Sequence, residues 1–235
     1  MIEVCETTWP PARSWNDGAW TFREGRGGGQ RVSATTENWT ATDADLPLAE
    51  REMRAMGQKC LFQIRPGDER LDALLEEHGY VVHDPVNIWA IDIARLTGEP
   101  LPRATVYADW PPLELARDIW RDGGVGPERL AVMERVTVEK SSILARAGDH
   151  PGGVGFVAID DDIAMVHALH VLPAQRRKGV GRLLLRAAAK WAEARGARVL
   201  SLVVTQGNHA ANPLYAGLGM SLVGHYHYRL KPEGS

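Results

Sequence analysis

Apolar positions in the second half of the chain recur with two different periods. In some segments apolar residues recur every three to four positions, which predicts helices. In others apolar and polar residues alternate, or every residue is apolar, which predicts strands. The predicted helices cover residues 113–121, 127–138, 179–195 and 208–218. The predicted strands cover residues 142–147, 155–159, 163–172 and 199–204, with turn residues at 148–153 and one bent strand or two at 220–230.

The first half of the chain gives a shorter series of the same kind. Strands are predicted at residues 20–36, 60–65 and 81–93, with a glycine turn or bulge at 27–29, and helices at 46–56 and 69–78. Breaker residues cluster between 97 and 112. We therefore expect a boundary there and two domains, residues 1–98 and 99–235.

The two halves show a weak similarity at an offset of 140 residues. Residues 61–64 fall on 201–204, and Gly79 falls on Gly219. Each half therefore presents a strand, a helix that ends in glycine and a second strand. Because this arrangement is common, both a duplicated unit and a chance similarity stay open.

Composition limits the partners of the chain. Of its 235 residues, 44% are hydrophobic and 24% are charged, as in an ordinary globular protein. The formal net charge of -3 gives no reason to expect nucleic acid or an anionic membrane as a partner. The two cysteines indicate neither a disulfide framework nor a metal site. Because neither a membrane-spanning run nor a secretion signal is evident, a cytoplasmic location is expected.

Residues 176–182 form an Arg-x-x-Gly-x-Gly turn between a predicted strand and a predicted helix. Backbone N–H groups beside Gly179 and Gly181 can surround a phosphate at a helix start, where the helix dipole also favours an anion. Four cations belong to this turn: Arg176, Arg177, Lys178 and Arg182. A glycine-rich turn with a solvated basic face would explain an isolated match equally well. A dinucleotide fingerprint is excluded because Leu184 occupies the position of its third small residue.

A second motif follows the apolar strand at 199–204. Its pattern Asn-x-x-Ala-x-x-Leu-Tyr-x-x-Leu-Gly is filled by Asn208, Ala211, Leu214, Tyr215, Leu218 and Gly219. In this order and spacing, the two motifs resemble the GCN5-related N-acetyltransferase (GNAT) family over residues 110–235. The resemblance implies an α/β (α+β) fold with a mixed, mostly antiparallel central sheet flanked by helices. The first half has neither the turn nor the tyrosine, so it resembles a degenerate, partial unit of the same kind.

The resemblance implies acetyl-CoA as the acetyl donor, with no metal. The backbone of Leu169 and Val171 would pair with the pantetheine arm, and Asn208 would contact the same arm. The turn would hold the pyrophosphate through Arg176, Arg177, Lys178, Gly179, Val180, Gly181 and Arg182.

The resemblance also implies direct attack of a primary amine on the thioester. Tyr215 matches the general acid of the family, although a tyrosine packed in the core is the other explanation. The acidic residue of many relatives falls on Met165. His167 shares the strand face of Met165, and it is either a base that relays a proton through water or a structural histidine. Regular alternation places His170 on the opposite face.

We therefore predict an N-acetyltransferase, an acyl-CoA-dependent transferase (EC 2.3.1.-). Its acceptor is expected to be a small amine, an amino acid or a peptide N-terminus, bound together with the donor in a ternary complex. A non-catalytic acyl-CoA-binding or sensing protein is the alternative, because Met165 lacks a carboxylate. Phosphate-dependent nucleotide binding is a third hypothesis. A homodimer is left open, and the tryptophans, seven of eight before residue 121, serve either packing or the acceptor site.

Overall fold

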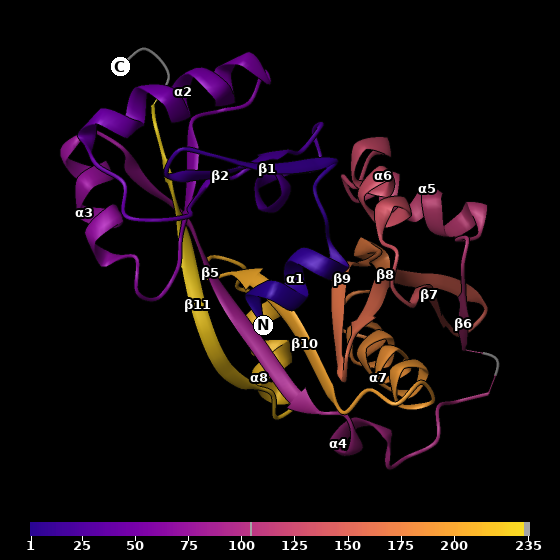
Figure 1. Ribbon diagram of the computed structural model, residues 1–235. Helices are drawn as coiled ribbons and strands as arrows, with labels where there is room; N and C mark the ends of the chain where they lie inside the picture. The colour runs from indigo at the N-terminus through magenta and orange to yellow at the C-terminus, as the bar shows by residue number, and fades with distance from the viewer. Residues whose placement is uncertain (104, 233–235) are drawn as a thin grey trace. The chain divides into compact units, whose positions relative to one another are not determined.

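The computed structural model describes residues 1–103 and 105–232 (Figure 1). Contacts divide these residues into two compact units, and each unit is assembled from segments that are far apart in the sequence. The first unit contains Met1–Pro10, Ile88–Val204 and His209–Val223. The second contains Pro11–Asn87, Thr205–Asn208 and the chain from Gly224 onwards.

The first unit is built on a mixed, mostly antiparallel sheet with the strand order β5-β10-β9-β8-β7-β6. Strands β9 and β10 run parallel, whereas β9 with β8, β8 with β7, and β7 with β6 run antiparallel. The strands are β5 (Val81–Asp92), β6 (Val106–Asp109), β7 (Lys140–Ala147), β8 (His150–Asp160), β9 (Ile163–Val171) and β10 (Val199–Thr205). Strands β5 and β11 (Ser221–Leu230) each run from one unit into the other.

Helices cover both faces of this sheet. Helix α7 (Val180–Glu193) packs on β7, β8 and β9. Helices α1 (Ile2–Thr8) and α5 (Glu114–Asp122) pack on β8 and β9 from the other face (Figure 1). The unit also contains α4 (Ala94–Thr97), α6 (Pro127–Arg135), the short 3-10 helix η3 (Pro173–Gln175) and α8 (Ala211–Gly217).

Helix α7 confirms the helix predicted over residues 179–195. Its helical period places seven residues against the sheet: Val180, Leu184, Leu185, Ala187, Ala188, Ala189 and Ala192. Burial of a leucine side chain contributes about 1.5–3 kcal/mol, so the two leucines contribute much of the packing energy of this face. Small alanines allow the helix to lie close to the strands.

The second unit has its own core. A three-stranded sheet of order β1-β2-β3 and the strands β4-β11-β5 surround it, and β11 pairs antiparallel with β4. Its elements are β1 (Arg13–Asp17), β2 (Trp20–Glu24), η1 (Gln30–Val32), β3 (Thr36–Glu37), η2 (Asp43–Asp45), α2 (Leu46–Ala55), β4 (Leu61–Ile64) and α3 (Glu69–Glu77). Trp20, Phe62 and Tyr80 are buried at its centre. The ring centroid of Phe62 lies 5.0 Å from that of Trp20 and 5.4 Å from that of Tyr80.

Several predicted elements differ from the structure. The predicted turn at 148–153 is confirmed only at Gly148 and Asp149, because β8 already begins at His150. The strand predicted at 20–36, with a glycine turn or bulge at 27–29, is β2 followed by a turn at 26–28, the helix η1 and the short strand β3. Helix α1 and strands β1 and β6 have no counterpart among the predicted elements.

The two units group the chain differently from the predicted halves, 1–98 and 99–235. Residues 1–10 and 88–98 belong to the first unit, together with most of the second half. The internal similarity nevertheless has a structural counterpart, because the order β4-α3-β5 repeats the order β10-α8-β11. A duplicated unit and a catalytic role for residues 99–235 stay predictions.

Strand β9 carries one more residue than β8 across the same length. The register joins Val154 to His170 and Phe156 to His167, so two positions of separation on β8 face three on β9. This is a β-bulge, and its extra residue is Ala168, whose φ of +48° lies in the left-handed region.

The bulge changes which face each later side chain of β9 takes. Before it, Ala164 and Val166 join the apolar cluster under α7. After it, Leu169 and Val171 pack against that same cluster. Even positions face α7 before the bulge and odd positions face it afterwards.

Gly153 on β8 lies close to the backbone of β9 just past the bulge. A Cβ added at Gly153 would lie 2.5 Å from the carbonyl oxygen of His170 and 3.0 Å from Cα of Val171. Backbone atoms cannot move aside cheaply, so Gly153→Ala is expected to lower the free energy of unfolding by about 2 kcal/mol, measured by urea titration. Gly98→Ala is the matched control, because Gly98 has a φ of -56° and nothing within 4 Å of the added Cβ. Equal stabilities of the two variants would contradict this packing.

Candidate functional site

The parallel pairing between β9 and β10 covers only the first part of each strand. Residues 163–166 pair with residues 199–202. Strand β9 then continues to Val171, and in the described part of the chain it forms no further pair with β10. An uncovered strand edge offers N–H and C=O groups to an extended ligand. The predicted backbone contacts, at Leu169 and Val171, lie on this uncovered stretch.

A buried tryptophan fixes the bulge at the start of the uncovered stretch. Nε1 of Trp120, on α5, donates a hydrogen bond to the carbonyl oxygen of Ala168 over 2.8 Å. Trp120 is fully buried. A non-glycine residue in the left-handed region costs on the order of 1–3 kcal/mol, so the surrounding packing must hold it there. Trp120 thus acts as a packing residue that determines the course of β9.

The uncovered edge leads into the turn that was predicted to bind an anion. Arg176, Arg177, Lys178 and Arg182 are exposed, and within the described residues none of them forms an ion pair with a carboxylate. Gly179 takes a left-handed φ of +80° as the N-cap of α7. The first turn of the helix then leaves the N–H groups of Val180, Gly181 and Arg182 without acceptors in the helix. Concentrated positive charge and free N–H groups together suit a phosphate.

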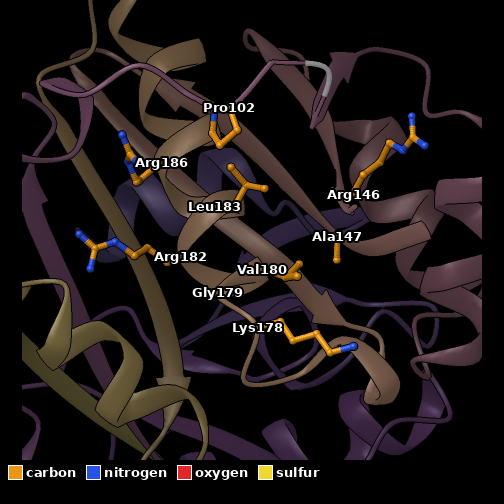
Figure 2. Close-up of a pocket in the computed structure, with 9 residues that line it drawn as sticks. All are labelled: Pro102, Arg146, Ala147, Lys178, Gly179, Val180, Arg182, Leu183 and Arg186. Atoms are coloured by element: carbon orange, nitrogen blue, oxygen red, sulfur yellow. The ribbon is translucent and has the colours of Figure 1, made fainter. Parts of the chain in front are cut away.

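A cavity of about 240 Å³ lies beside this helix start (Figure 2). Its lining consists of Pro102, Arg146, Ala147, Lys178, Gly179, Val180, Arg182, Leu183 and Arg186. Figure 2 shows the side chains of Lys178, Arg182 and Arg146 extending in different directions, so the positive charge is spread around the opening. Arg186 is already occupied, because it donates to the carbonyl oxygen of Glu99 over 2.8 Å. The volume is below that of a pocket for a whole cofactor and suits one anionic group.

Helix α8 brings the predicted acid next to the turn. A Cβ added at Gly181 would lie 2.8 Å from Cδ2 of Leu214, so α8 approaches the first turn of α7 closely. Tyr215 follows Leu214 and is 5% exposed, within the apolar cluster under α7. Its ring centroid lies 6.4 Å from that of Trp89.

Burial also determines the protonation of Tyr215. It raises the pKa of the phenol to about 12, so the hydroxyl keeps its proton throughout the physiological range. Within the described residues this hydroxyl makes no hydrogen bond. Tyr215 is therefore a proton donor with no hydrogen-bond partner among the described residues.

Asn208 lies between β10 and α8, in the segment Thr205–Asn208 that groups with the second unit. Its N–H donates to the carbonyl oxygen of Thr205 over 3.0 Å, which closes a tight turn. Its contact with the pantetheine arm stays a prediction.

His167 is buried against the N-terminal helix. It is 2% exposed, its ring stacks on Trp9 at 4.9 Å, and its Nε2 lies 2.8 Å from Oγ1 of Thr8. The Thr8 hydroxyl donates its single proton to the carbonyl oxygen of Val4 over 2.6 Å. His167 must then donate from Nε2, which leaves Nδ1 as the nitrogen that could accept a proton. A base at His167 stays a prediction.

His170 lies on the same face as His167, so the prediction of opposite faces is wrong. The prediction assumed regular alternation, and the extra residue Ala168 breaks it. The ring of His170 lies over Gly123, where an added Cβ would be 2.6 Å from Nδ1. Nε2 of His170 is buried and has no hydrogen-bond partner in the described part of the chain.

Two opposing charges act on His170. Burial lowers the pKa of its imidazole, and the positive charge of Arg176 lowers it further, while Asp122 acts in the opposite direction. Since an ordinary histidine has a pKa near ~6.5, His170 is neutral at pH 7.

Met165 lies at the position where an acidic residue was considered. It is fully buried against Val4 and Cys5 of α1. No carboxylate therefore acts from this position. Within the described residues no cluster of three metal-ligating side chains occurs, and no helix is long and apolar enough to cross a bilayer.

Sequence reasoning missed three contributors to this region. Trp120 holds the bulge, Thr8 holds His167, and Arg146 lines the cavity. Tryptophan is common in cores and threonine is common on surfaces, so neither residue type gave a signal. A pairing of residues 8 and 167 leaves no trace in local periodicity.

A family model supports the resemblance stated above. The model described as "Acetyltransferase (GNAT) family" matches residues 102–220. A curated relative, "Uncharacterized N-acetyltransferase YobR" from Bacillus subtilis (strain 168), is 24% identical over 242 residues. That alignment covers 97% of this chain and 96% of the relative.

Solved structures share the fold over most of the chain. A GCN5-related N-acetyltransferase from Kribbella flavida matches with a TM-score of 0.70 and 19% identity, covering 99% of this chain and 95% of the other. A tandem GNAT protein from the clavulanic acid biosynthesis pathway matches with a TM-score of 0.61 and 13% identity, covering 83% and 74%. The latter shows that this fold is compatible with a tandem arrangement.

The hydrogen bond between His167 and Thr8 can be tested directly by substitution of the threonine. Thr8→Val keeps the shape of the side chain but leaves the Nε2–H of His167 buried without an acceptor. The expected loss is about 1–3 kcal/mol of unfolding free energy, measured by denaturant titration. Thr7→Val is the matched control, because the Thr7 hydroxyl is exposed and bonds its own helix at 3.3 Å from the carbonyl oxygen of Glu3. A Thr8 variant no less stable than the Thr7 variant would show that the bond to His167 does not form.

Proposed function

Because the chain belongs to the acetyltransferase (GNAT) family, we propose that it transfers an acetyl group from acetyl-CoA to a primary amine. The observation that carries this proposal is the uncovered edge of β9, which leads directly into the cationic turn at residues 176–182. An extended arm with a diphosphate at one end fits this combination. The thioester would supply the activated acetyl group.

The turn would hold the diphosphate of the donor. Arg176, Arg177, Lys178 and Arg182 have no competing carboxylate among the described residues, so an incoming anion meets uncompensated charge. The backbone N–H groups at Gly179, Val180 and Gly181 would add directional hydrogen bonds at the helix start. In this proposal the edge of β9 at Leu169 and Val171 pairs with the amide groups of the pantetheine arm, which Asn208 also contacts.

Two groups would stabilise the reacting centre. The N–H of Val171 would face the negative charge that develops on the thioester oxygen, as an oxyanion donor does. Tyr215 would give its proton to the sulfur as the carbon–sulfur bond breaks. Because Tyr215 makes no hydrogen bond within the described residues, its proton is available for this transfer.

The energetics require the proton to move together with bond cleavage. The phenol has a pKa of about 12, and a thiol in water has a pKa of about 8.5. From these two values, proton transfer from the phenol to the thiolate costs roughly 5 kcal/mol. The apolar surroundings that raise the pKa of Tyr215 would raise the pKa of a thiol held beside it, because burial disfavours both anions. Contact between the two groups therefore reduces the difference.

The acceptor class follows from what the chain lacks. With a formal net charge of only -3, little favours a strongly basic protein tail. We propose a small amine, an amino acid or a peptide N-terminus as the acceptor. The fully buried Met165 is the observation that favours the second candidate, a non-catalytic acyl-CoA-binding protein.

Tyr215→Phe tests the catalytic role and separates the two candidates. The variant is expected to lose about 100-fold in kcat, because a general acid contributes factors of this order, while the Kd for acetyl-CoA stays unchanged. Turnover is measured as release of free thiol over a panel of amines, and binding by calorimetry. Tyr107→Phe is the control, since Tyr107 is an exposed tyrosine on β6.

An unchanged kcat in the Tyr215 variant would remove that residue from the mechanism. Tight acetyl-CoA binding by the wild-type chain without turnover of any amine would instead favour the non-catalytic candidate. Because the raised pKa of Tyr215 keeps its proton in place, the wild-type kcat should not fall through ionisation of this residue up to pH 10.

A further inference from the structure

His170 lies on β9 two residues past the bulge, on the stretch of strand that β10 does not cover. We propose that His170 is the general base that takes the proton from the ammonium group of the acceptor. This inference rests on the proposed acetyltransferase function and names the group that the sequence left open.

The strongest support is a polar atom without a partner. Nε2 of His170 is buried, and within the described residues no group bonds to it. Buried polar atoms in proteins are nearly always paired, so an unpaired one beside a ligand site indicates an external partner. The ammonium group of an acceptor could donate a hydrogen bond to Nε2 of His170, either directly or through one water.

The ring is also held firmly in one place. It packs over Gly123, where a Cβ would lie 2.6 to 2.7 Å from three ring atoms. Any larger residue at position 123 would displace the imidazole. The bulge that turns His170 to this face is held in turn by the hydrogen bond from Trp120 to Ala168 over 2.8 Å. Three neighbouring features thus fix the orientation of one histidine.

The proton balance of the step is simple. Neutral His170 accepts one proton from the ammonium group, which leaves a free amine and an imidazolium. The lone pair of the amine then forms the bond to the acetyl carbon, and the thiolate that leaves takes a proton from Tyr215. The nitrogen of the new amide loses its second proton, which restores the phenol of Tyr215, and the imidazolium of His170 releases its proton to solvent. The net reaction therefore gives an amide, a free thiol and one proton released to solvent.

The charges around His170 make its basicity depend on the cofactor. Asp122, beside Gly123, and Arg176, on the turn after β9, are the charged groups that act on it, while its partner on β8 is the apolar Val154. Arg176 lowers the pKa of His170. A diphosphate seated on Arg176 would offset that charge and raise the pKa, so the base would become stronger once the donor is bound.

His167 is less suited to the same task. Its Nε2 is committed to Thr8 at 2.8 Å, and its ring is covered by Trp9 at 4.9 Å. Its contacts are those of a positioning residue that holds β9 against α1. The two histidines therefore provide a matched pair for experiment, on one strand and one face.

The test compares pH profiles of kcat/KM for wild type, His170→Gln, His167→Gln and His150→Gln, the last an exposed histidine at the start of β8. With a working base, kcat/KM should form a plateau around neutral pH. Without it, only free amine can react, so with an alkylamine as acceptor log kcat/KM should rise with unit slope toward the amine pKa of about 10.4. For His170→Gln we expect this slope and a loss of roughly 100-fold at pH 7, with acetyl-CoA affinity retained.

A second variant guards against a structural effect. His170→Ala should regain activity with added imidazole, in proportion to its neutral form. Calorimetry in buffers of different ionisation enthalpy should show proton uptake on CoA binding near pH 6, and this uptake should be absent from His170→Gln.

The outcomes separate the two proposals. An active wild type whose His170→Gln variant keeps its plateau and its rate within about threefold of wild type would overturn the assignment of His170 and leave the acetyltransferase function standing. If His170→Gln keeps its plateau while His167→Gln shows the unit slope, the general base is His167 instead. Absence of turnover in the wild type would overturn both proposals.

Discussion

The extra residue at Ala168 determines how the first unit meets its ligands. It holds a left-handed backbone conformation, and a hydrogen bond from the fully buried Trp120 keeps its carbonyl oxygen in place. Strand β9 pairs with β10 only as far as Val166, and past Ala168 its side chains exchange faces. One strained residue on this uncovered edge thus directs Leu169 toward α7 and turns His170 toward α5.

The chemistry of the proposed reaction follows from this change of direction. The freed edge leads into a turn whose cations have no acid partner among the described residues, so charge and backbone donors follow one another along the chain. Apolar packing around Tyr215 keeps its phenol protonated, and burial together with Arg176 keeps His170 neutral. The proposed acid and the proposed base thus begin in the required protonation states at neutral pH.

Local patterns in the sequence predicted much of this arrangement. The 3.6-residue period of helix α7, the apolar run of β10 and the Arg-x-x-Gly-x-Gly turn are local features, and each was found where predicted. The direction of His170 was not, because alternation is a local rule and the bulge depends on a tertiary bond to Trp120. Helix α1 was missed for a related reason, since seven residues with weak periodicity owe their place to packing on β8 and β9 rather than to their own pattern.

Hydrogen exchange of the backbone amides of β9 tests the central claim most directly. If the bulge frees this edge for the donor, saturating acetyl-CoA should slow exchange at residues 167–172 and in the turn at 176–182. Exchange in β1, β2 and β3 of the second unit should not change. Binding of acetyl-CoA that leaves β9 unprotected, or that protects only residues elsewhere, would contradict the account.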